Sequence, residues 1–93
     1  MKITITDTSW GIDRRTGNRS ERVVACETFE LAVGFLPEIG PAKRAFEVTK
    51  LTDGSVTILL NIKGDTVTIH RGKSYFYRPM SMDGGHYYLF EVE

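Results

Sequence analysis

Two histidines, His70 and His86, and one cysteine, Cys26, are the side chains of this sequence best suited to bind a metal ion. Carboxylates such as Asp65 and Asp83 complete the set of candidate ligands. Structural metal sites need cysteines or histidines at short, repeated spacings, and the sequence has no such pair. In the hairpins that the turns at 71–72 and 83–85 predict, the two histidines lie at opposite ends of a strand of about nine residues, roughly 25–30 Å apart. The sequence therefore predicts no metal site, and nothing in it indicates a cofactor.

Cys26 is also the one candidate thiol nucleophile. Its neighbours Val24 and Ala25 are apolar, and Glu27 disfavours the thiolate that such chemistry requires. A free cysteine in these surroundings is usually a small buried apolar side chain, so we expect Cys26 to be buried. The sequence also has neither a Gly-x-Ser-x-Gly motif nor a glycine-rich phosphate loop. These absences predict a protein that is not an enzyme.

A polar, arginine-rich segment over residues 10–22 is the strongest local concentration of charge. Four arginines offer forked donors that suit phosphate, and Trp10 offers an aromatic surface for stacking; the arginines are Arg14, Arg15, Arg19 and Arg22. The whole chain, however, balances 12 basic against 12 acidic residues. This balance favours a solvated loop and argues against nucleic acid as a partner. Binding of nucleic acid or a phosphate anion through this loop is kept as an alternative function.

The elements that position these residues belong to one small domain. The chain has 93 residues, of which 41% are hydrophobic, and this length leaves room for a single core over residues 1–93. A single cysteine cannot form an internal disulfide, which favours a reducing compartment and predicts a cytoplasmic protein. The sequence has no apolar run near the 20 residues that a membrane-spanning helix needs, so we expect no contact with membranes.

Strand patterns dominate the sequence. Threonine, valine and isoleucine are abundant, and apolar residues alternate with polar ones over most segments. The segment 20–32 is the one possible helix, but its aromatic and β-branched residues favour a strand. The expected strands cover residues 2–8, 23–27, 30–36, 45–51, 56–62, 66–70, 74–78 and 87–93. A loop rich in proline and glycine over residues 37–43 interrupts them.

Three glycine-containing turns predict hairpins and their registers. A three-residue turn over 53–55 pairs Val48 with Leu60, whereas a two-residue turn would break the apolar face. A two-residue turn at 71–72 pairs Val67 with Phe76. A three-residue turn over 83–85 pairs Phe76 with Val92, and Met80 with Tyr88. The sequence therefore predicts an all-β fold, a small antiparallel β-sandwich or partly open β-barrel of about six to eight short strands.

The same registers predict a surface rich in tyrosine. Six of the ten aromatic residues lie between Tyr75 and Phe90. If Phe76 and Phe90 face the core, then Tyr75, Tyr77, Tyr87 and His70 lie mostly on the opposite side. Tyrosine is enriched in recognition surfaces because it offers a large contact area with a polar tip. An alternative interpretation is that a second sheet or the 37–43 loop covers these rings.

The function most consistent with these patterns is a non-enzymatic interaction module. It would use the tyrosine-rich hairpin or a free sheet edge to bind a protein partner or a second copy of itself. A third possibility is that a small molecule binds in the mouth of the barrel, next to His70 or Cys26. That possibility predicts a pocket beside one of these two residues.

Overall fold

The computed structural model describes residues 1–79 and 85–93, and within them it contains strands, turns and loops but no helix. Eight antiparallel strands form two four-stranded sheets. The strands are β1 (Lys2–Ile12), β2 (Arg19–Glu30), β3 (Gly34–Phe35), β4 (Glu47–Leu51), β5 (Ser55–Leu59), β6 (Thr66–His70), β7 (Ser74–Tyr77) and β8 (His86–Val92). The all-β prediction is confirmed, and so is the choice of strand over helix for residues 20–32. No described segment forms a helix that is long and apolar enough to cross a membrane.

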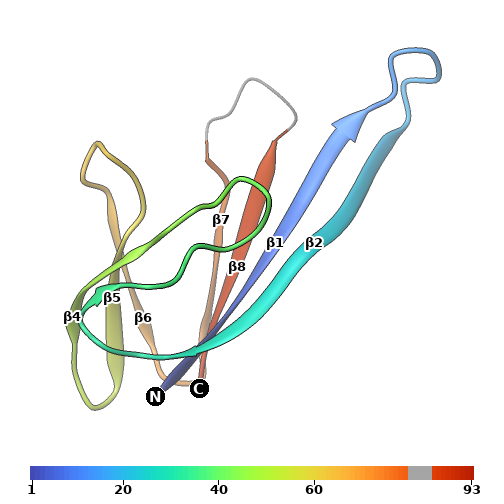
Figure 1. Ribbon diagram of the computed structural model, residues 1–93. Coiled ribbons are helices and arrows are strands. Elements are labelled where there is room, and N and C mark those ends of the chain that lie inside the picture. Colours follow the sequence, from blue (N-terminus) through green and yellow to red (C-terminus); the bar gives the residue numbers. More distant parts are fainter. Residues whose placement is uncertain (80–84) are drawn as a thin grey trace.

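The two sheets face each other without closing into a barrel. The first sheet has the order β2-β1-β8-β7, and the second has the order β3-β4-β5-β6. Strands β6 and β7 are therefore edge strands of different sheets, although they follow each other in the chain. The two strands lie close together at the turn that joins them, near both chain ends, and they diverge with distance from this turn (Figure 1). The sandwich is consequently open along one side.

The core lies between the inner faces of the sheets. Alternation along β1 turns Ile3 and Ile5 inward, and the same period applies to Tyr88, Phe90 and Val92 in β8. The second sheet contributes its own alternating set, and the connecting segments add five more side chains. The other buried apolar residues are Leu31, Leu36, Ile39, Phe46, Val48, Val56, Ile58, Leu60 and Ile69.

Much of the predicted loop over residues 10–22 is in fact strand. β1 continues to Ile12 and β2 begins at Arg19, so the turn between them covers only residues 13–18. The resulting β1–β2 ribbon extends past the other strands (Figure 1). The sequence underestimates the length of these two strands, because the polar residues of the ribbon are solvated on both faces. Such residues lack the alternation that marks a half-buried strand. The segment expected as a strand over 30–36 is likewise reduced to Gly34–Phe35.

The β4–β5 hairpin corrects one predicted register. Asp53 and Gly54 form a two-residue turn, in which the backbone N–H of Thr52 donates to the carbonyl of Ser55 at 2.9 Å. A regular two-residue hairpin would place Val48 opposite Leu59. A β-bulge between Val48 and Lys50 shifts the pairing, so that Val48 faces Ile58 instead. The apolar face is thus restored by the bulge, and the three-residue turn was wrong.

The predicted hairpin at 71–72 is also wrong. The chain changes sheets there, and Val67 pairs with Ile58 rather than with Phe76. The backbone N–H of Arg71 donates to Gly54 of the second sheet, and that of Gly72 donates to Val92 of the first. A glycine turn between two strands marks a reversal of the chain but does not show whether the strands share a sheet.

The β7–β8 register differs by three residues from the expected one. Phe76 pairs with Leu89, not with Val92, and Tyr88 pairs with Tyr77. Because the side-chain period of a strand is two, an odd shift exchanges the two faces. Phe76 therefore points outward, and Tyr75 and Tyr77 lie on the inner side, opposite to the prediction. Met80 and the predicted turn residues Asp83 and Gly84 lie outside the described residues.

Candidate functional site

The first sheet has an exposed face, turned away from the second sheet, which we call the outer face. Cross-strand pairs define it, because residues directly opposite each other share a face. One row joins Thr6 to Cys26 and Leu89, and Leu89 to Phe76; the next joins Thr8 to Val23 and Tyr87. No other described strand covers this face. Phe76 keeps 53% and Val23 keeps 58% of its surface exposed, so apolar side chains on both edge strands of the outer face are open to solvent.

Aromatic rings extend along the outer face toward the β1–β2 ribbon. The ring centroids of Phe76 and Tyr87 lie 5.0 Å apart. Trp10 comes next, and its backbone N–H donates to the carbonyl of Gly85 at 2.9 Å. Its indole ring lies across Gly85 so closely that a Cβ at that position would overlap the ring. Glycine at 85 therefore lets the tryptophan lie flat on the sheet.

Arginines border the aromatic row. The guanidinium carbons of Arg19 and Arg78 lie 5.0 and 5.1 Å from the ring of Trp10. Arg19 also forms a 2.9 Å salt bridge with Glu21. A hydrogen bond with the Glu21 carboxylate raises the pKa of Tyr87. Both signs of charge therefore lie beside the aromatic rings, because Glu21 partly offsets the two arginines.

The four predicted binding residues do not form one surface. Tyr87 lies on the outer face, whereas Tyr77 packs inward, with its ring centroid 6.2 Å from that of Phe46. Tyr75 is on the inner side at the edge of the first sheet, opposite Phe90. His70 is exposed at the end of β6 in the second sheet, opposite Ser55. Phe76 was missed as a surface residue because its register with β8 was wrong.

The predicted anion-binding residues are divided as well. Arg14 and Arg15 lie in the 13–18 turn, whereas Arg19 and Arg22 occupy β2 on opposite faces. Trp10 is already flanked by Arg19 and Arg78, so a nucleic-acid base would have to displace one of them to stack on it.

Cys26 is exposed on the outer face instead of buried.

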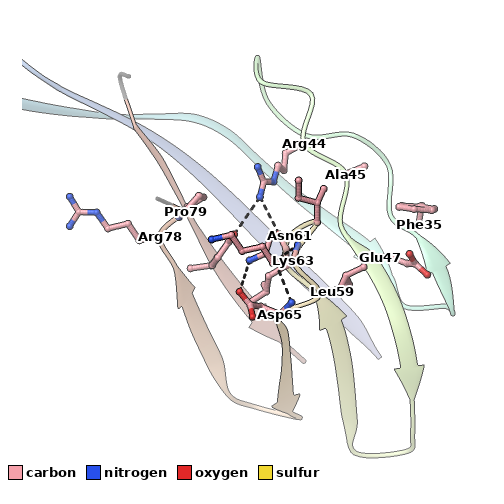
Figure 2. Close-up of a pocket in the computed structure, with 13 residues that line it drawn as sticks. Phe35, Arg44, Ala45, Glu47, Leu59, Asn61, Lys63, Asp65, Arg78 and Pro79 are labelled. Carbon is pink, nitrogen blue, oxygen red and sulfur yellow. Dashed lines mark hydrogen bonds between the residues drawn. The ribbon is translucent and has the colours of Figure 1, made fainter. Parts of the chain in front are cut away.

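A cavity of about 780 Å³ lies at the open end of the sandwich, between the 60–65 segment, the start of β4 and the end of β7 (Figure 2). Neither His70 nor Cys26 lines this cavity, so its position differs from the one that the sequence predicted. Its polar residues include Arg44, Lys63 and Tyr77. Apolar side chains form much of the remaining wall: Phe35, Ala45, Leu59, Leu60, Ile62 and Pro79.

Arg44 is the central polar group of this cavity. Its side chain is half-buried, and one terminal nitrogen donates to the Leu60 carbonyl at 3.1 Å and to the Tyr77 hydroxyl at 3.4 Å. Its guanidinium also lies 5.6 Å from the ring of Phe46. Among the described residues, no carboxylate lies within 4.0 Å of Arg44 or Lys63. The cavity therefore combines an apolar wall with three cations, Arg44, Lys63 and Arg78, and with two carboxylates, Glu47 and Asp65.

A buried acid lies on the inner face near the middle of β1. Asp7 is fully buried, and its Oδ1 lies 2.7 Å from Nδ1 of His86. Its Oδ2 has no hydrogen-bond partner among the described residues. Burial, followed by the Asp7 charge, raises the pKa of the neighbouring Tyr88. Residues 1–79 and 85–93 contain no group of three or more metal-ligating side chains.

Comparison with protein-family models, with curated proteins and with solved structures found no match to this chain.

Proposed function

We propose that this protein is an interaction module that binds a protein partner through the outer face of its first sheet. The observation that carries the proposal is the aromatic row of Phe76, Tyr87 and Trp10 on a sheet face that no other described strand covers. Exposed apolar surface of this kind on a small domain is typical of a binding site. Aromatic and arginine side chains dominate the binding energy of most protein interfaces.

Replacing Phe76 with serine is expected to weaken partner binding strongly without unfolding the domain, because the side chain is more than half exposed. A buried aromatic anchor typically contributes at least about 2 kcal/mol to binding, a roughly 30-fold loss of affinity. The measurement compares proteins captured from cells by wild-type and F76S baits, followed by reconstitution with the purified partner.

Phe35→Ser is the matched control, since Phe35 is 74% exposed but belongs to the second sheet. A partner that is lost with F76S and kept with F35S supports the proposal. Recovery of the same partner by all three baits would exclude the outer face.

A second candidate function is binding of a small carboxylate or phosphate in the cavity. Arg44 favours it, because its half-buried guanidinium forms no salt bridge with a described carboxylate, and Lys63 adds a second, exposed cation at the cavity wall. We expect succinate or inorganic phosphate to shift the NMR signals of cavity residues with saturation near or below about 1 mM, and Lys63→Met to weaken this binding. Lys50→Met, on the exposed side of β4, is the control. Unchanged spectra with both anions would rule out this function.

A further inference from the structure

β2 differs from every other long strand in the structure. It is 12 residues long, and none of its side chains is buried. Within the described part of the chain it pairs with β1 alone, so its second edge has unpaired backbone N–H and C=O groups. Figure 1 shows this edge along the outside of the first sheet. A long exposed edge with apolar side chains such as Val23 is a ready template for another strand.

The charges along β2 are arranged symmetrically about its middle. Both basic residues, Arg19 and Arg22, lie in the first part, and two of the three acidic residues, Glu27 and Glu30, lie at the end; Glu21 is the exception. An antiparallel copy of the strand, centred between Val24 and Ala25, opposes each basic residue to an acidic one. The facing pairs are Arg19–Glu30, Ser20–Phe29, Glu21–Thr28, Arg22–Glu27, Val23–Cys26 and Val24–Ala25, each formed twice.

The bulge in β2 makes this register consistent with the faces of the sheet. In a regular strand, residues whose numbers differ by an odd amount lie on opposite faces, and such residues do not face each other in a ladder. The pairing of β1 with β2 shifts by one residue here: Asp7 pairs with Ala25, but Thr8 pairs with Val23. Val23 and Cys26 therefore share the outer face, and Arg22 and Glu27 share the inner one.

Registers shifted by two residues do not oppose every basic residue to an acidic one. A shift of two residues one way opposes Glu21 to Glu30, which places two acids together. A shift of two residues the other way leaves Arg22 opposite Ala25. Arg22 and Glu27 are both exposed, and neither forms a salt bridge in the described residues. Arg22 of one copy can therefore form a salt bridge with Glu27 of the other.

We propose that two copies of this chain pair through the free edges of β2, in this register, to form one continuous eight-stranded sheet. The occupant of the edge is a second copy because the charge pattern of β2 is complementary to itself. Opposite charges across a ladder set the register, while backbone hydrogen bonds and the Val23–Cys26 contacts hold the edges together. This dimer is independent of the outer-face function proposed above, since it uses the edge of the sheet and leaves that face open.

Charge exchange tests the pairing. Analytical ultracentrifugation is expected to show a wild-type dimer, and R22E or E27R alone is expected to raise the dissociation constant about tenfold, because like charges then face each other twice. The double variant R22E/E27R restores the pairs and is expected to regain wild-type affinity. A monomeric wild type, or a double variant no tighter than the single ones, would overturn the proposal.

Disulfide trapping tests the register. Val23→Cys places a thiol opposite Cys26 of the second copy, within the range that a disulfide spans. We expect a covalent dimer on a non-reducing gel, and none with V23C/C26S, the matched control. A V23C protein that dimerises in solution but forms no cross-link, or dimerisation that is lost in F76S, would assign the interface to another surface and refute the β2 pairing. Failure of the outer-face function would instead leave both dimer experiments unchanged.

Discussion

Replacing Phe46 with alanine is expected to lower the free energy of unfolding by about 3–5 kcal/mol, a large part of the total stability of so small a domain. Phe46 is 1% exposed and lies just before β4. Its ring packs edge-to-face against Tyr88 and Phe90 of the opposite sheet, with ring centroids 5.2 and 4.9 Å apart. The substitution therefore leaves a cavity and removes aromatic contacts that join the two sheets.

Urea denaturation of F46A, followed by tryptophan fluorescence and circular dichroism, measures this loss. Phe35→Ala is the control, because Phe35 is a phenylalanine of strand β3, next to β4, whose side chain is 74% exposed. We expect F35A to change the free energy of unfolding by less than about 0.5 kcal/mol. Equal effects of the two substitutions would show that Phe46 does not join the sheets.

Gly40→Ala is expected to be the second most damaging change, at about 2–4 kcal/mol. Gly40 has a φ of 73°, which side chains other than glycine rarely adopt. A Cβ at this position would also overlap Oδ2 of Asp7, which is itself fully buried. The substitution therefore forces the 37–43 loop away from β1 and disturbs the Asp7–His86 hydrogen bond.

Gly17→Ala separates the two causes of this loss. Gly17 has nearly the same φ, 71°, but nothing lies within 4 Å of a Cβ built there. We expect G17A to cost about 1 kcal/mol, which is the backbone contribution alone. Thermal unfolding of both variants measures the difference, and a G40A protein as stable as G17A would show that the loop moves aside without cost.

The outer face illustrates which parts of a candidate site a sequence reveals. Tyr87 and Trp10 were each singled out for their residue types, but they were assigned to two separate functions. Pairing of β1 with β8 brings them to one face. Phe76 and Arg78 join them there, and neither was named beforehand as a site residue. Residue type identifies a candidate, whereas strand register decides its neighbours.

Strand and turn positions followed from local rules. Alternation identified the strands that have one buried face, such as 66–70, and Gly54 marked a hairpin. Local rules failed where the backbone departs from regularity. A bulge after Val48 and another near Val24 each change which residues face each other, and neither has a reliable signal in a single sequence.

The amino-acid sequence by itself determined the all-β class, the positions of most strands and the presence of turns, because these depend on side-chain periodicity and on the backbone freedom of glycine. Only the tertiary structure decided that β6 and β7 belong to different sheets, that Phe76 faces outward and that Asp7 is buried beneath Gly40. The physical reason is that strand pairing is non-local. A shift of one or three residues exchanges the faces of a strand, and the choice depends on how all the apolar faces pack at once.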